Sequence, residues 1–161
     1  MTRVRPVEEN DIPALYVAWQ DLRQHNANTD SRIRPTPVSE AEFANAVRDL
    51  RHRPLSLSLV AEDEGNVVGF VTASIESNQP DRLPERHATI GYLYVAPAYR
   101  RQGVATALVR QVFDWARQQD GVSHVEMSVL EHDVSARSFW ESLGFSPFIR
   151  RVWAPLEPAS P

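Results

Sequence analysis

One stretch of the sequence constrains the fold more than any other, because it joins a strand to a helix through a very short connection. Residues 88–96, ATIGYLYVA, predict a strand that ends at Pro97. Residues 98–113 read AYRRQGVATALVRQVF, and the apolar residues from Val104 onward recur with the period of a helix. A strand, a helix and a further strand in this order are typical of a βαβ unit. The stretch therefore predicts a sheet that contains a parallel pair.

The start of this helix differs from the other expected helix starts, because no side chain there can cap it. Each other start has a side-chain oxygen for the free N–H groups of the first turn: Asn10 or Asp11, Ser39, and Asp133 or Ser135. Before Gly103 stand Arg100 and Arg101, two cations at the positive end of the helix dipole. Gly103 and Ala105 are small, and Thr106 adds a hydroxyl. The pattern favours a phosphate-binding site, while capping by water remains the alternative.

The rest of the chain alternates between strand and helix patterns without a repeat or a linker. Strands are expected at 2–7, on both sides of a turn at 64–66, at 123–130 and at 145–154. Helices are expected from 10 or 11 to about 24, from a capping box at Ser39 and Glu42 to about 51, and over 134–143. The order β-α-α-β-β-β-α-β-α-β indicates a mixed α+β fold in one domain, residues 1–154, with a disordered tail at 155–161.

Composition and charge exclude several classes of protein. Apolar residues make up 42% of the 161 residues, which is enough to fold one ordinary domain. The net charge of −4 argues against a general nucleic-acid binder. No apolar run approaches the ~18 residues of a membrane span, and the first residues do not resemble a signal peptide. We therefore expect a cytoplasmic protein that binds neither nucleic acid nor membrane.

Two residue types are missing, and their absence excludes particular chemistries. Without cysteine, the chain has no disulfide, no thiolate metal site and no cysteine nucleophile. Without lysine, since all 17 basic residues are arginine, a P-loop NTPase and a Schiff-base enzyme are excluded. We also expect no metal cofactor.

The strand and the loop together resemble the GNAT superfamily of acyl-CoA-dependent N-acetyltransferases. That family's strand has the form I-x-x-L-x-V, followed by a proline turn and R/Q-x-x-G-x-G/A at the start of a helix. The corresponding residues here are Ile90, Leu93, Val95, Pro97, Arg100, Gly103 and Ala105. A second family motif, loosely N-x-x-A-x-x-x-Y-x-x-x-G-F, corresponds to Asp133, Ala136, Trp140, Gly144 and Phe145. The resemblance implies a mixed, mostly antiparallel central sheet with flanking helices.

The resemblance also implies a cofactor, acetyl-CoA, and a place for each part of it. The pyrophosphate would lie on the N–H groups of residues 101–106, and the pantetheine would pair with residues 93–95. The Val95 N–H would then stabilise the oxyanion that forms at the acetyl carbonyl. The residues implied in cofactor binding are Leu93, Tyr94, Val95, Arg100, Arg101, Gln102, Gly103, Val104, Ala105, Thr106, Asp133, Ala136, Arg137 and Trp140. For Arg137, a solvent-exposed side chain is the alternative.

Three positions depart from the family pattern. Trp140 stands where the family usually has a tyrosine that protonates the leaving thiolate, and an indole N–H is not a usable acid. Its alternative role is packing in the core. Asp133 replaces an asparagine, so it can accept a hydrogen bond from pantetheine but cannot donate one. Gly91 stands where many members carry a carboxylate base. The proton acceptor is therefore sought at Glu126 and His132, with Tyr92, Glu85 and His87 as further candidates.

The sequence therefore predicts an N-acetyltransferase that acts on the primary amine of a small molecule or peptide. The amine would attack acetyl-CoA directly in a ternary complex, because no cysteine can carry the acetyl group. The acceptor would meet the loops 24–38 and 77–87, whose carboxylates include Asp30 and Glu85. The alternative is a non-enzymatic acyl-CoA sensor on the same fold, and a third hypothesis is an unrelated anion-binding module. A homodimer is left open.

Overall fold

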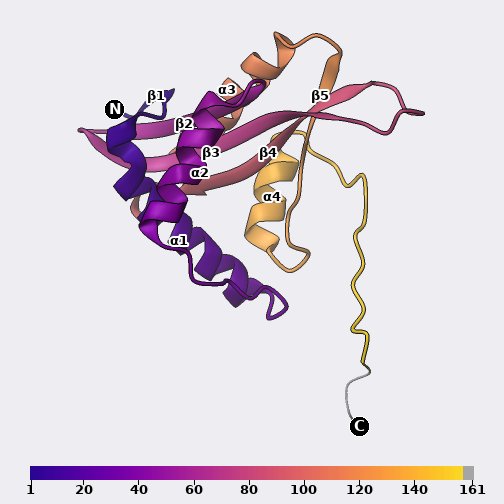
Figure 1. The fold of residues 1–161 in the computed structure, drawn as a ribbon, viewed down its shortest axis with the longest axis horizontal. Helices are drawn as coiled ribbons and strands as arrows, with labels where there is room; N and C mark the ends of the chain where they lie inside the picture. The colour runs from indigo at the N-terminus through magenta and orange to yellow at the C-terminus, as the bar shows by residue number, and fades with distance from the viewer. Residues whose placement is uncertain (158–161) are drawn as a thin grey trace.

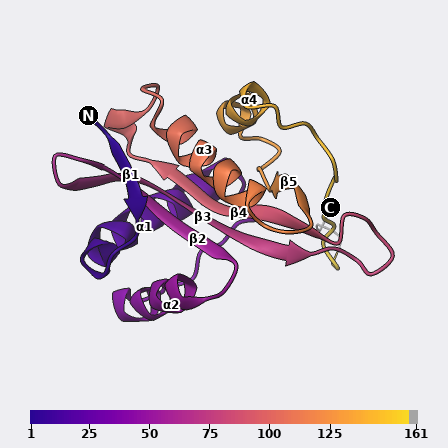
Figure 2. The same cartoon turned by 90° about the horizontal axis from the view of Figure 1, so that it is seen from above.

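The computed structural model describes residues 1–157 and shows one sheet with helices on both of its faces (Figure 1). The strands are β1 (Arg3–Pro6), β2 (Ser56–Asp63), β3 (Asn66–Ser77), β4 (Arg86–Val95) and β5 (Val122–Met127). The helices are α1 (Ile12–Thr29), α2 (Glu40–His52), α3 (Val104–Arg117) and α4 (Val134–Ser142), with short 3-10 turns at Glu9–Asp11 and Pro97–Tyr99. Figure 2 shows α1 and α2 on one face and α3 and α4 on the other.

The sheet has the order β1-β2-β3-β4-β5, and its pairing confirms the mixed fold class. The first four strands pair antiparallel, whereas β5 lies parallel to β4, as the βαβ pattern predicts. The pairing of β4 with β5 ends at Ile90 and Met127, but β4 continues along β3 as far as Val95. Strand β5 therefore ends where β4 continues, and within residues 1–157 no strand pairs with the last part of β4 on its β5 side.

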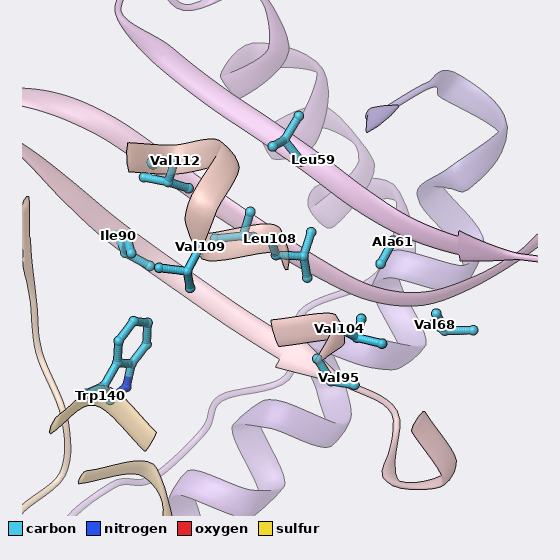
Figure 3. Close-up of a cluster of buried hydrophobic side chains, with 12 residues drawn as sticks. Leu59, Ala61, Val68, Ile90, Val95, Val104, Leu108, Val109, Val112 and Trp140 are labelled. Carbon is cyan, nitrogen blue, oxygen red and sulfur yellow. The ribbon is translucent and has the colours of Figure 1, made fainter. Parts of the chain in front are cut away.

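Two apolar clusters hold the helices against the sheet. Under α3, the side chains of Leu108, Val109 and Val112 are almost fully buried against β2, β3 and β4 (Figure 3). Their spacing of one, three and four residues places them on a single face of the helix. On the other face of the sheet, α1 and α2 cover a second cluster that includes Phe70 and Tyr94. Strand β4 contributes to both clusters, so its position is fixed from both sides.

The strand expected at residues 145–154 does not form, and this part of the predicted order is wrong. The structure assigns no strand after Met127 in the described chain, and the segment after Gly144 runs away from the sheet (Figure 1). Its sequence explains this result, because the apolar pairs at 148–149 and 152–153 flank two arginines. A strand needs alternation with a period of two, and this pattern gives neither face a continuous apolar surface. Of the tail expected at 155–161, residues 158–161 lie outside the described residues, and the division into one domain stays a prediction.

The helix starts agree with the expectation at two positions and differ at one. Ser39 caps α2 and forms the predicted capping box with Glu42. Asp133 caps α4 by accepting from the Ala136 N–H. At α1, neither Asn10 nor Asp11 supplies a side-chain cap, because the helix continues directly from the 3-10 turn at Glu9–Asp11. The Asp11 carboxylate is used elsewhere, since it pairs with Arg5 at 2.7 Å and accepts from the Glu8 N–H at 2.7 Å.

We predict that Asp11 makes the stability of the fold depend on acid. Burial alone would raise the pKa of the Asp11 carboxyl. The hydrogen bonds and the charge of Arg5 lower it by more than burial raises it, so the pKa of Asp11 lies below the usual value. A carboxyl whose pKa is lower in the folded state stabilises the fold at pH values above its ordinary pKa. This stabilisation is lost as the pH falls through the pKa of the folded state. Asp11→Asn should therefore lower the free energy of unfolding by about 2 kcal/mol at neutral pH.

The same variant should reduce the loss of stability between about pH 5 and pH 2. Urea unfolding at a series of pH values measures both effects. Asp114→Asn is the control, because Asp114 also pairs with an arginine but is 60% exposed. Equal slopes of stability against pH for the Asp11 variant and the parent protein would contradict this assignment.

Candidate functional site

The site begins at the end of β4, where no strand of the described residues pairs with the backbone of Val95 on the β5 side. The Ala96 N–H donates to the Val68 carbonyl at 2.8 Å, and the Tyr92 N–H donates to Thr72 Oγ1 at 3.0 Å. Both groups point toward β3. Because N–H directions alternate along a strand, those of Leu93 and Val95 point the other way, toward the side that β5 has left. The Val95 N–H is therefore a fixed donor directed into the gap.

The loop between β4 and α3 has the backbone form of an anion-binding site. Arg101 and Gly103 have φ angles of 62° and 81°, which lie in the left-handed region. In the described part of the chain, no N–H group of residues 101–106 donates a hydrogen bond, and α3 has no side-chain cap. Successive N–H groups of a loop with these φ angles point into one concave space. That space lies at the N-terminus of α3, which is the positive end of the helix dipole. The geometry agrees with the phosphate-binding site that the sequence predicts.

The polar side chains of this loop hold it against the end of β4. Arg100 Nε donates to the Val95 carbonyl at 2.9 Å, and Gln102 Nε2 donates to the Ala98 carbonyl at 2.9 Å. The Arg100 guanidinium is therefore directed toward the gap between the strands. Beyond the loop, a groove of about 390 Å³ follows α3 from Thr106 to Arg117 and is lined by Leu143 on its other side.

Asp133 lies at the start of α4, and both of its carboxylate oxygens are already engaged. One oxygen accepts from the Ala136 N–H at 3.0 Å, and the other lies 2.7 Å from His25 Nε2 at the end of α1. Burial raises its pKa, but the bonds from His25 and Ala136 outweigh burial and lower it. The charged carboxylate therefore joins α1 to α4. Arg137, in the same turn of α4, donates to the Glu131 carbonyl at 3.1 Å.

Trp140 belongs to the apolar core, and its ring is 6% exposed. Its ring lies 5.0 Å from those of Phe139 and Phe145 in edge-on contacts. Figure 3 shows Trp140 beside Val109 and Ile90. The packing role that the sequence left as an alternative is therefore observed. The same cluster contains Val95 and Val104, so α4 packs on the same apolar cluster as the end of β4 and the start of α3.

The two residues named as proton acceptors lie in different parts of the molecule. Glu126 on β5 is opposite Thr89, which stands six residues before Val95, about 20 Å along the strand. His132 is exposed in the loop between β5 and α4, next to Asp133. Its charge contributes to lowering the pKa of Asp30, after the larger effect of Arg32. The structure therefore places His132 in the loop after β5, at the start of α4, and places Glu126 about 20 Å from Val95 along the strand.

The further candidates are also separated from one another. Gly91 lies at an irregularity in the pairing of β3 with β4, and a Cβ there would come 3.0 Å from Thr72 Oγ1. Tyr92 follows it and is half-exposed, whereas Glu85 lies in the loop before β4. His87, at the start of β4, contacts Glu126 instead.

Sequence reasoning missed two features of this region. It gave His25 no role, and nothing in the local pattern of α1 indicates a partner more than a hundred residues away. It also treated His87 and Glu126 as separate candidates, although they meet His124 in one cluster. The spacing of His124 and Glu126, two residues apart on a strand, was the available signal, because such residues share a face.

Comparisons with known proteins agree with the fold and the site. Residues 19–145 match the acetyltransferase (GNAT) family. Aminoglycoside N(6')-acetyltransferase type 1 of Acinetobacter haemolyticus is 31% identical over 110 residues, which are 66% of this chain and 74% of that protein. N-acetyltransferase 8 of Homo sapiens is 41% identical over 86 residues, 53% of this chain but only 37% of the human protein. The chain thus spans little more than a third of that relative.

A solved structure extends the likeness over nearly the whole chain. Aminoglycoside N-acetyltransferase AAC(6')-Iy, in complex with CoA, has a TM-score of 0.73 at 15% identity and covers 96% of this chain and 94% of that one. The chain belongs to the GNAT family of acetyltransferases. None of the helices in the described part combines the length and apolar character that crossing a bilayer needs.

Proposed function

We propose that this chain transfers an acetyl group from acetyl-CoA to a primary amine. The observation that carries the proposal is the free Val95 N–H, which points into the gap beside an uncapped loop with two arginines. Membership of the GNAT family supports it, as do relatives named N-acetyltransferases and a structural neighbour with CoA bound. A backbone donor and an anion cradle in one cleft suit a thioester that carries phosphates at its far end.

The cofactor would use the residues that the family motifs name. Its pyrophosphate would accept hydrogen bonds from the N–H groups of residues 101–106, with Arg101 supplying charge and Thr106 a hydroxyl. Its pantetheine arm would pair with Leu93 and Val95 in the place that β5 leaves free. Ala136 and Trp140 would form the apolar wall on the α4 side. Asp133 would keep α4 in position, because both of its oxygens already hold parts of the chain.

The chemical step would be a direct attack by the neutral amine on the acetyl carbonyl carbon. A C–N bond forms while the carbonyl oxygen gains negative charge, which the Val95 N–H stabilises. The C–S bond then breaks, the nitrogen loses one proton to a bound water, and the thiolate takes a proton from that water, so that the products are the amide and free CoA. A thiol with a pKa of about 8.5 is a good leaving group, so the family's tyrosine is not essential at the Trp140 position. Catalysis would come mainly from positioning and from this hydrogen bond.

His132 is the proton acceptor that the geometry supports best. A lysine-like amine has a pKa of about 10, so most of it is protonated at neutral pH and must lose a proton before attack. His132 lies in the loop where β5 ends, whereas Glu126 is about 20 Å from Val95 along the strand. Because the His132 imidazole is exposed, it would take the proton from the amine through one bound water.

We expect His132→Gln to lower kcat by about 100-fold, since a positioned base contributes this much or more. The acidic limb of the pH–rate profile should disappear with it, because the glutamine amide cannot take up a proton. His52→Gln is the matched control, as His52 is an exposed histidine on α2. An unchanged pH profile in the His132 variant would remove this residue from the mechanism.

A measurement of thiol release tests the proposed function itself. The protein, with acetyl-CoA and a panel of aminoglycosides, polyamines and peptides, should release free CoA with at least one amine. Tight binding of acetyl-CoA without turnover on the whole panel would favour the alternative, a non-enzymatic acyl-CoA sensor. Gly91 and Trp140 favour that alternative, because neither can carry a proton. Binding of simple phosphate as tight as that of CoA would instead support an unrelated anion-binding module.

The sequence predicts that the acceptor meets the loops 24–38 and 77–87, and the carboxylates of Asp30 and Glu85 in these two loops differ in their partners. The Asp30 carboxylate is paired with Arg32 at 2.9 Å, so its charge is largely compensated inside the loop. Glu85 is exposed in the loop before β4 and has no such partner in the described chain. Glu85, however, stands ten residues before Val95, about 33 Å along β4, so neither carboxylate is expected to attract a cationic amine strongly to the transfer centre.

We also propose a homodimer in which the C-terminal segment contacts a second copy. Phe148, Ile149, Val152 and Trp153 are 63–83% exposed, and no strand of the described chain lies on the outer edge of β5. Extended chain that adds to an open edge would cover both. Sedimentation of the full chain should give twice the monomer mass, and replacement of Val152 and Trp153 by serine should return it to a monomer. A monomeric parent protein would contradict this proposal.

A further inference from the structure

Three side chains that can bind a metal ion meet at the start of the parallel strand pair. His87 comes from β4, and His124 and Glu126 come from β5. His124 Nε2 lies 2.9 Å from one carboxylate oxygen of Glu126, and His87 Nε2 lies 3.5 Å from the other. One ligand atom from each residue lies within 4.8 Å of the other two. The carboxylate thus stands between two imidazoles whose rings are stacked 5.6 Å apart.

The chemistry of this cluster fits a divalent transition-metal ion. Two imidazoles and one carboxylate are a ligand set that Zn²⁺ uses, with a water in the fourth position. Tetrahedral bonds to nitrogen and oxygen place ligand atoms about 3.3 Å apart, and the three ligand atoms here lie within 4.8 Å of one another, so they would have to close by at most about 1.5 Å. Rotation of the exposed His124 ring would supply that movement. The single negative charge of Glu126 offsets half of the charge of the ion.

The burial of His87 adds to this argument. Its side chain is only 12% exposed, and its Nδ1 atom is buried without a hydrogen-bond partner in the described chain. The burial holds the ring in place with Nε2 directed at Glu126, so this ligand atom is already positioned. The nearest cation in the sequence, Arg86, is directed to the Asp120 carbonyl and so is already held.

We infer that His87, His124 and Glu126 form a binding site for a divalent transition-metal ion of the zinc class. The site lies apart from the proposed transfer centre, because His87 stands eight residues before Val95, about 26 Å along β4. The ion would hold β5 against the start of β4, at the end of the sheet opposite the gap. This role differs from catalysis, and it departs from the expectation that the chain uses no metal.

Titration of the untagged full chain with Zn²⁺ tests the inference. We expect one ion per chain with a micromolar or lower Kd, a rise in Tm with added Zn²⁺, and a tetrahedral Co²⁺ spectrum in the visible region. His124→Gln and Glu126→Gln should each weaken binding at least 10-fold. His52→Gln is the control for a surface histidine and should bind Zn²⁺ as the parent does.

The outcomes separate this site from unspecific binding and from the proposed function. Binding that is absent at 100 µM Zn²⁺, or equal in His124→Gln and the parent, would overturn the inference. Circular dichroism without metal should show that the His124 variant is folded, since His124 is 38% exposed. The readout is metal binding and Tm, so it holds whether or not acetyl transfer is observed.

Discussion

Gly103→Glu is expected to abolish binding of coenzyme A, with a rise in Kd of at least about 100-fold. The first turn of α3 would lose its free N–H groups to the new carboxylate, which would also repel the phosphates. The backbone adds a second effect, because Gly103 has a φ of 81° and any side chain is strained there. A Cβ at this position meets no atom within 4 Å, so the expected loss does not come from a clash inside the protein.

Gly65→Glu is the matched control for this variant. Gly65 has a φ of 82°, and its Cβ would also meet nothing within 4 Å, but it lies in the β2–β3 turn. The same charge and the same backbone strain are therefore added away from the phosphate loop. Calorimetric titration with CoA should leave this control within about threefold of the parent. Equal affinity of the Gly103 variant and the control would show that the cofactor lies elsewhere.

Leu108→Ala is expected to lower the free energy of unfolding by about 2–5 kcal/mol. Leu108 is 0% exposed and lies at the centre of the cluster between α3 and the sheet (Figure 3). Alanine is a good helix former, so the loss would come from apolar contacts and from the cavity, and not from the helix itself. A domain of this size should then unfold roughly 5–15 °C lower.

Leu83→Ala separates this effect from the general loss of a leucine. Leu83 is 84% exposed in the loop before β4, so its replacement should change stability by less than about 0.5 kcal/mol. Urea unfolding followed by circular dichroism gives both values. A loss below 1 kcal/mol in the Leu108 variant would mean that α3 is not packed as described.

The parts of the fold that the sequence predicted best are those with local causes. The Ser39 capping box, the turn at 64–66 and the apolar face of α3 each depend on residues within a few positions of one another. The phosphate loop belongs to the same group, because Gly103 and the missing cap are visible in one short stretch. The family resemblance then supplied the mixed, mostly antiparallel form of the sheet, which local patterns alone leave open; the order of its strands was not predicted.

The features that were not predicted depend on contacts between distant residues. The cluster of His87, His124 and Glu126 exists only because β5 lies parallel to β4 in one particular register. The pair between His25 and Asp133 likewise requires the end of α1 to reach α4. The expected last strand was a wrong local prediction. The β-branched and aromatic residues at 145–154 suggested a strand, but they do not alternate with polar residues, so they cannot cover one face of a sheet.

The hydrogen bond from Arg100 to the Val95 carbonyl joins the two ends of the proposed cofactor site. A side chain beside the phosphates thereby supports the peptide unit next to the one that faces the thioester. Contacts made by the nucleotide end can then affect the rate of the reaction and not only its affinity. Acetyl-pantetheine, a shortened donor without the nucleotide, would be processed with a reduced kcat even at saturation, because no phosphate would then bind the loop that Arg100 joins to the Val95 peptide.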